Sequence, residues 1–231
     1  MRRLRAALRW AAYAVLGLIL LSAAWVALYR VVDPPGTLLM LIRQAQGTHA
    51  IRHAPVPLAR ISPHLVRAVI GAEDSRFCFH HGVDLEAVEA ALEDNREGGT
   101  FRGASTITMQ VAKNAFLWPD RSWARKGAEL WFTLLVEAFW PKARVMEVYL
   151  NIAEWGPGVF GAEAAARHWF GKSAAALTPG EAARLAAILP SPLKWDAARP
   201  GPYVARRAAT LERRAAVVRR DGLAGCVLSA P

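Results

Sequence analysis

Residues 62–74 have the sequence SPHLVRAVIGAED, an apolar helical pattern that ends on two acids. Ser62 suits the N-cap and Pro63 suits the first helical position, so a helix is expected to begin there. A carboxylate at the end of an apolar helix can lie in a cleft of low dielectric constant, where its pKa rises and it accepts a proton near neutral pH. Glu73 and Asp74 are therefore candidate functional residues. Solvated acids at an ordinary helix end are an equally good interpretation of this segment alone.

Helical patterns also fill most of the chain after this segment. Asp84 is a candidate N-cap, and the sequence Thr178-Pro179-Gly180-Glu181 is a capping box with proline at the first helical position. Few runs alternate between apolar and polar residues, so little β-sheet is expected. The sequence predicts a mainly α fold, with helices over residues 62–74, 85–92, 105–116, 122–140, 142–151, 182–189 and 203–220.

The run from Trp10 to Tyr29 is mostly apolar and carries no charged residue. About 20 such residues form a helix of about 30 Å, which matches the hydrocarbon core of a bilayer. Positive residues stay on the cytoplasmic side, so the arginines before the run predict a cytoplasmic N-terminus and an exported remainder. The alternative is a signal peptide cleaved near Ser22-Ala23-Ala24, although the length of the run favours a retained anchor. Both interpretations argue against nucleic acid as a partner.

The break Asp33-Pro34-Pro35-Gly36 divides the chain. We expect a cytoplasmic tip and transmembrane anchor over residues 1–32, a connector over 33–59 and one helical domain over 60–231. The formal net charge of +10 predicts attraction to anions such as nucleic acid, phospholipid headgroups or phosphorylated substrates, and charge alone does not choose among them. Cys78 and Cys226 lie far apart and show no zinc-binding spacing. A disulfide between them is left open, but two separate buried thiols are the favoured interpretation.

A second polar cluster lies in residues 102–114, RGASTITMQVAKN. Glycine and small hydroxyl residues open a helix there, and the free backbone N–H groups at a helix N-terminus favour an anion. Ser105, Thr106 and Gln110 are able to donate hydrogen bonds to sugars or phosphates. A capped and packed helix without a ligand is the more frequent meaning of such a segment when it stands alone.

A third cluster lies in residues 120–129, DRSWARKGAE. Arg125 and Glu129 are four residues apart and share a helix face, with Arg121 on the same side if the helix begins early enough. The functional interpretation is a basic face that grips pyrophosphate, with one acid among the cations. The alternative is an ion pair on the protein surface, which contributes little to stability.

Four ordered patterns can be recognised in the exported region: Glu73-Asp74-x-x-Phe77-x-x-His80-x-Gly82, Gly103-Ala104-Ser105-Thr106-Ile107-Thr108-Met109-Gln110, Arg125-Lys126-x-x-Glu129 and Lys142-x-x-x-Met146-Glu147-x-Tyr149-Leu150-Asn151. Together they resemble the peptidoglycan glycosyltransferases, the family that includes the glycosyltransferase module of bifunctional penicillin-binding proteins. The second pattern departs from that family at Ala104 and Met109, where glycine and glutamine are usual. Any one pattern is common, but the ordered set is specific and covers most of the exported region.

The resemblance implies a lysozyme-like helical domain with a cleft beside the membrane, and it makes residues 60–231 the glycosyltransferase domain. It implies that the 4-hydroxyl of lipid II attacks C1 of the growing lipid-linked glycan, with inversion and release of undecaprenyl pyrophosphate. Glu73 is then the base, and Glu129 assists departure directly or through a divalent metal ion. The residues expected to bind the substrate are Asp74, Phe77, His80, Ser105, Thr106, Gln110, Lys113, Arg121, Arg125 and Lys126.

The resemblance also implies partners and a location. The partners are lipid II, the growing glycan chain and membrane lipid, with other cell-wall synthesis proteins left open and no nucleic acid. One span is expected to anchor the enzyme in the inner membrane, with the catalytic domain in the periplasm. No cofactor is required, although Mg²⁺ or Mn²⁺ at Glu129 is left open.

Three other interpretations compete with this one. Ser191-Pro192-Leu193-Lys194 has the spacing of a penicillin-binding nucleophile, but no K-T-G sequence follows, so a monofunctional enzyme without a transpeptidase domain is expected. A lysozyme-like enzyme that cleaves glycan is the main enzymatic alternative, and it would need no pyrophosphate site. A membrane-anchored envelope scaffold would use the arginines of the last helix, which otherwise form a solvated face or contact anionic lipid.

Overall fold

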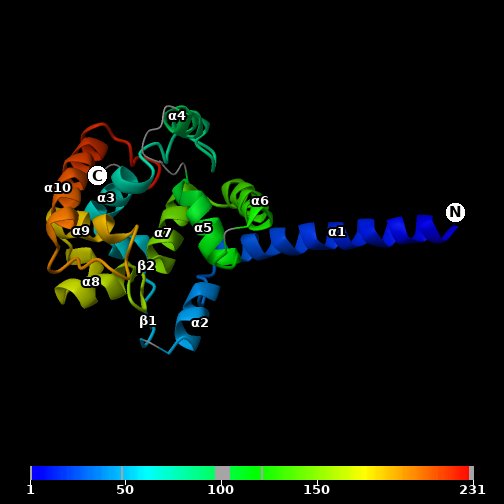
Figure 1. Ribbon diagram of the computed structural model, residues 1–231, viewed down its shortest axis with the longest axis horizontal. Coiled ribbons are helices and arrows are strands. Elements are labelled where there is room, and N and C mark those ends of the chain that lie inside the picture. Colours follow the sequence, from blue (N-terminus) through cyan, green and yellow to red (C-terminus); the bar gives the residue numbers. More distant parts are fainter. Residues whose placement is uncertain (1, 48, 97–104, 121, 229–231) are drawn as a thin grey trace.

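The computed structural model describes residues 2–47, 49–96, 105–120 and 122–228. Over these residues the protein is mainly α-helical, as predicted, with one small sheet in the order β1-β3-β2. Figure 1 shows a rounded helical body from which α1 extends as a single long helix. The elements are α1 (Arg2–Tyr29), α2 (Leu38–Ala45), β1 (Arg52–His53), α3 (Pro63–Glu73), α4 (Leu85–Arg96), α5 (Ile107–Phe116), α6 (Trp123–Phe139), α7 (Lys142–Ile152), β2 (Glu154–Gly156), β3 (Val159–Phe160), α8 (Ala162–Phe170), α9 (Pro179–Ile188) and α10 (Pro202–Arg220).

Helix α1 is long and apolar enough to cross a membrane, over Arg3–Tyr29. Its apolar side chains are exposed along most of its length, and Figure 1 shows that the helix stands clear of the body except at its last turns. Water would solvate such a surface poorly, whereas lipid tails would cover it at no cost. These features agree with the predicted membrane anchor.

The last turns of α1 are fixed to the body by buried contacts. The indole N–H of Trp140 donates to the backbone oxygen of Val26 over 2.8 Å, and Val26 is fully buried. The Arg144 guanidinium donates to the backbone oxygens of Tyr29 and Val32, each over 2.9 Å. These donors satisfy carbonyl groups that a helix end leaves without partners inside the helix. The body is therefore held at one orientation to the end of the anchor.

Two groups of helices make up the body. Helices α3, α9 and α10 pack against one another, and α5 packs against α6 and α7 on the side where α1 joins. The groups meet where the end of α3 contacts the start of α5, because the Asp74 carboxylate accepts a hydrogen bond from the backbone N–H of Ile107 over 3.0 Å. This junction positions the residues considered below.

The helix boundaries follow caps that are visible in the sequence. Ser62 caps α3, and Thr178 and Glu181 form the predicted capping box at the start of α9. Helix α5 begins two residues later than predicted, at Ile107, because the Thr106 side chain is the N-cap. The segment 33–59, expected to be a connector, contains α2 and β1. The pattern residues Gly103 and Ala104 lie outside the described residues.

Cys78 and Cys226 form a disulfide bond, so the prediction of two separate thiols was wrong. The bond links the loop after α3 to the segment after α10, across a sequence separation of 148 residues. No local pattern relates these cysteines, and only the packing of α10 against α3 brings the two segments together. The bond agrees with an exported location, because oxidising compartments preserve disulfides.

Replacing Cys78 and Cys226 by serine should destabilise the body without changing its helix content. A bond that closes a long loop restricts the unfolded chain and typically contributes about 2–4 kcal/mol. We expect a lower midpoint of thermal unfolding, followed by circular dichroism, and a similar shift for the reduced wild type. An unchanged midpoint in both the double variant and the reduced protein would contradict the bond.

Candidate active site

Asp74 joins the two helix groups beside the end of α3. Its buried carboxylate accepts a hydrogen bond from the His80 ring over 2.9 Å and another from the backbone N–H of Ile107 over 3.0 Å. One side chain thus connects α3, the loop after it and the N-terminus of α5. Hydrogen bonds to a charged group are stronger than neutral ones, and a helix N-terminus favours a negative charge. Asp74 therefore fixes the position of the neighbouring Glu73 relative to α5.

The loop between α3 and α4 packs next to the site through buried side chains. Phe77 has no exposed surface, and His80 is buried beside Asp74. Gly82 has a φ of +84°, and a Cβ atom there would lie 2.8 Å from side-chain atoms of Thr133 and Glu137 in α6. Only glycine combines this conformation with so close an approach. Phe77 and His80 thus shape the site, and their direct contact with a substrate stays a prediction.

Glu73 is half-buried and receives a hydrogen bond from α5. The Gln110 amide donates from Nε2 to Oε2 of Glu73 over 2.9 Å, and the Tyr149 hydroxyl donates to Gln110 Oε1 over 3.4 Å. Burial raises the pKa of Tyr149 well above its usual value, and the negative charges of Glu73 and Asp74 raise it further. Tyr149 therefore keeps its proton and orients the amide so that the N–H group of Gln110 points to Glu73.

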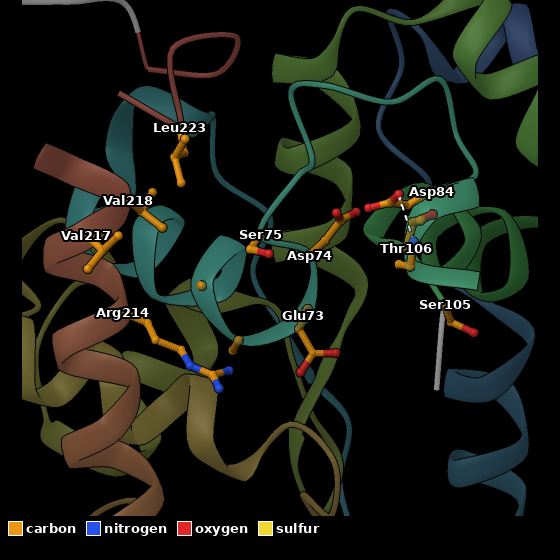
Figure 2. A pocket seen from close by; sticks show the side chains of 13 residues that line it. Glu73, Asp74, Ser75, Asp84, Ser105, Thr106, Arg214, Val217, Val218 and Leu223 are labelled. Carbon is orange, nitrogen blue, oxygen red and sulfur yellow. Dashed lines mark hydrogen bonds between the residues drawn. The ribbon is translucent and has the colours of Figure 1, made fainter. Parts of the chain in front are cut away.

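A cleft of about 490 Å³ opens beside Glu73. Figure 2 shows Glu73 between side chains of α10, including Arg214, on one side and Ser105 and Thr106 on the other. The Thr106 hydroxyl donates to the backbone oxygen of Gly82 over 2.5 Å and also caps α5, so it is already used inside the protein. Ser105 is exposed at the rim, where its hydroxyl can reach a ligand.

A group of charged side chains from α5 and α6 lies next to this cleft. Arg125 and Lys126 donate to the two carboxylate oxygens of Glu129, over 2.5 Å and 2.7 Å, and Glu129 is only 3% exposed. Burial lowers the pKa of Lys113; Glu129 raises it, the charges of Arg125 and Lys126 lower it, and Glu73 raises it slightly. The charges of these two carboxylates and two cations all act on the Lys113 ammonium group. The structure therefore brings these five predicted residues together.

A second cavity of about 380 Å³ is lined by Lys113. Its walls include Asn114 and Trp118, at and beyond the end of α5, and Leu39 of α2. Because α2 follows α1 closely in the chain and packs on α5, this cavity lies toward the membrane anchor. Arg121, which was expected to join the cations, lies outside the described residues.

Helix α6 presents an exposed apolar surface beside the anchor. Trp123 is 92% exposed, and Leu130 and Leu134 are also exposed. The indole N–H of Trp131 donates to the Ser22 hydroxyl of α1 over 3.1 Å, two turns before the end of that helix. This face of α6 therefore lies at the depth of the last turns of the apolar span, where lipid is its natural surrounding.

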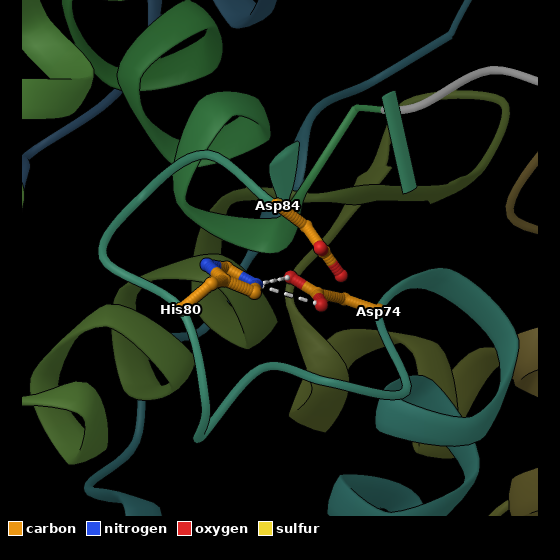
Figure 3. Close-up of side chains that lie close together, drawn as sticks. All are labelled: Asp74, His80 and Asp84. Atoms are coloured by element: carbon orange, nitrogen blue, oxygen red, sulfur yellow. Dashed lines mark hydrogen bonds and ion pairs between the residues drawn. The ribbon is translucent and has the colours of Figure 1, made fainter. Parts of the chain in front are cut away.

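Metal ligation has one geometric candidate among the described residues. Ligand atoms of Asp74, His80 and Asp84 lie within 4.8 Å of one another. Figure 3 shows these three side chains close together. These groups already bind inside the protein, since Asp74 holds His80 and Asp84 pairs with Arg76 over 3.3 Å. The carboxylate of Glu129 is surrounded by cations, which does not suit a divalent metal ion. We therefore assign the cluster a structural role.

Two residues of the site were not predicted from the sequence. Tyr149 lies in the fourth pattern, where it was given no role, although a polar residue in an apolar stretch was an available signal. Arg214 was interpreted as part of a solvated or lipid-binding face, because the arginines of its helix carry no sign of which ones face inward. Its place in the cleft depends on the packing of α10.

The chain is similar to known proteins over most of its length. A family model described as Transglycosylase matches residues 40–220. A biosynthetic peptidoglycan transglycosylase of Rhodospirillum centenum is 63% identical over 221 residues, which covers 96% of each chain. Proteins of the same name from Caulobacter vibrioides and Pseudomonas aeruginosa are 55% and 53% identical, over 87% and 83% of this chain and 88% and 85% of theirs. The resemblance is confirmed, and the chain belongs to the transglycosylase family of enzymes that polymerise the glycan strands of peptidoglycan.

Proposed function

We propose that this enzyme transfers the growing lipid-linked glycan to the 4-hydroxyl of lipid II, with inversion at C1 and release of undecaprenyl pyrophosphate. The observation that carries the proposal is the placement of one carboxylate, Glu73, in an open cleft near the partly exposed cations around the buried Glu129. A base and a pyrophosphate site are the two groups that this reaction needs. A glycan-cleaving enzyme would have no use for the second.

Glu73 acts as the base in this scheme. One of its oxygens accepts a hydrogen bond from Gln110, and the other has no partner among the described residues. The free oxygen accepts the proton of the attacking hydroxyl as the bond to C1 forms. Gln110, oriented by Tyr149, keeps the carboxylate in place without neutralising it. The base is therefore fixed in position but still accessible from the cleft.

The leaving pyrophosphate is stabilised by Lys113, Arg125 and Lys126. Charge that develops on the leaving group is best stabilised by cations fixed in advance in a partly dry site. Glu129 holds Arg125 and Lys126 through both of its oxygens, so we assign it the role of positioning these cations. We propose that Arg121 contributes a further positive charge, as the sequence suggested.

The geometry of the anchor supports a reaction at the membrane surface. The cavity next to Lys113 lies toward α1 and α2, so the lipid tails of the substrates leave the site on that side. The exposed face of α6 contacts the same lipid layer. We propose an inner-membrane protein with a cytoplasmic N-terminus and its catalytic domain in the periplasm.

Glu73→Gln should reduce polymerisation of labelled lipid II by about 1,000-fold, because a positioned general base typically contributes between 100-fold and 10,000-fold. The amide has nearly the same shape, so the midpoint of thermal unfolding should stay unchanged. Glu89→Gln, an exposed acid of α4, is the matched control and should keep full activity. Normal chain elongation by the Glu73 variant would remove this residue from the base role.

Lys113→Arg should change how activity depends on pH. Burial lowers the pKa of Lys113, so the wild-type ammonium loses its proton, and its attraction for pyrophosphate, at a lower pH than an exposed lysine would. A guanidinium stays charged throughout this range. In a profile of kcat/KM against pH, the alkaline decline of the wild type should move to higher pH in the variant. Identical alkaline declines would show that Lys113 is not the titrating cation.

The enzyme should stay active after metal ions are removed, because the cations of the site come from the chain and the proposed scheme requires no cofactor. We expect polymerisation by the wild type to persist after treatment with EDTA. Loss of activity that Mg²⁺ or Mn²⁺ restores would instead place a divalent ion on the substrate pyrophosphate. Lys113→Met, assayed in parallel, shows whether an added ion replaces the missing charge.

A further inference from the structure

One face of α10 carries three arginines that the proposed reaction does not use. Arg206, Arg207 and Arg214 line a shallow cavity of about 280 Å³ together with Tyr203 and Thr210. No hydrogen bond or ion pair engages these three guanidinium groups within the part of the chain that the structure describes, and the Nε atom of Arg207 is buried without a partner. By contrast, Arg220, the last residue of α10, forms an ion pair with Asp221. The cavity thus gathers unneutralised positive charge.

This cavity adjoins the catalytic cleft through a shared residue. Arg214 lines both, and Figure 2 shows its side chain extending from α10 toward the side of the cleft where Glu73 lies. Gly71 allows this approach, because a Cβ atom there would lie only 3.1 Å from the Cβ atom of Arg214. Gly71 lies two residues before Glu73 on α3. A ligand in the cleft can therefore extend along the basic face of α10.

The position of α10 favours a source other than membrane headgroups for the anion. Figure 1 shows α10 at the end of the body opposite to the point where α1 leaves it. The cations proposed to bind pyrophosphate come from α5 and α6, on the side of the anchor. Charge on membrane headgroups acts over about one Debye length, roughly 8 Å at physiological ionic strength. The anion must belong to a part of the substrate that points away from the bilayer.

We propose that Arg206, Arg207 and Arg214 bind carboxylates of the peptide that the disaccharide in the cleft carries. The proposal rests on the proposed function, since it assigns a further subsite to the same substrate. A guanidinium matches a carboxylate with two parallel hydrogen bonds, and an unpaired guanidinium in a hollow is ready to form them. The exposed ring of Tyr203 offers a surface for the peptide beside these cations. The subsite selects glycan that bears an acidic peptide.

The test compares two preparations of lipid II in neutral detergent micelles, one with free peptide carboxylates and one with the same peptide amidated. For the wild type, KM should be about fivefold lower with the free carboxylates, as expected for a few solvent-exposed ion pairs. The double variant Arg206→Gln with Arg207→Gln should lose this preference and keep its kcat on the amidated substrate. Arg219→Gln with Arg220→Gln removes equal charge from the same helix outside the cavity and should keep the preference.

Several outcomes would overturn the subsite. One is equal KM values of the wild type for both substrates, and another is an equal loss by the Arg206 and Arg207 variant on both. A defect that appears only in vesicles with anionic phospholipid would assign the arginines to lipid. If the double variant unfolds, two other measurements test the subsite. The single variant Arg206→Gln should show a smaller difference in KM between the two substrates, and added salt should reduce this difference for the wild type. Failure of the wild type to polymerise either substrate would refute the proposed function itself.

Discussion

The bond between Asp74 and the start of α5 is the constraint on which the rest of the site depends. A buried carboxylate needs partners, and Asp74 finds them in the His80 ring and the backbone N–H of Ile107. Those partners lie in segments that the chain would otherwise leave free to move relative to α3. With Asp74 in place, Glu73 faces Gln110 and α5 points its charged turn toward α6. The first and second sequence patterns thus become one surface.

Two carboxylates near that surface lie in different surroundings. Glu73 lies in an open cleft with one oxygen free, whereas Glu129 is buried with both oxygens bound to cations. The charges of both carboxylates raise the pKa of Lys113. In the proposed mechanism the same residue type serves two purposes, because the surroundings decide whether a carboxylate accepts a proton or holds a cation. The division matches a reaction that removes a proton at one place and releases an anion at another.

The helices at the two ends of the body determine which way the cavities of the site face. Trp140 and Arg144 fix the end of α1 against the body, so the cavity near Lys113 faces the anchor. At the opposite end of the body, α10 forms one wall of the cleft. The disulfide between Cys78 and Cys226 links the segment after α10 to the loop that follows α3. The cleft is thereby bounded by α3 and the start of α5 on one side and by the last helix, which supplies Arg214, on the other.

The sequence by itself predicted the long apolar first helix, the helix caps and the three clusters of polar and charged residues, because these depend on residues within a turn or two of one another. Capping at Ser62 and the pairing of Arg125 with Glu129 need only local geometry. The tertiary structure alone decided the disulfide, the capture of Ile107 by Asp74 and the entry of Arg214 into the cleft. Each joins segments far apart in the chain, and which side chains meet there depends on how whole helices pack. No local spacing carries that information.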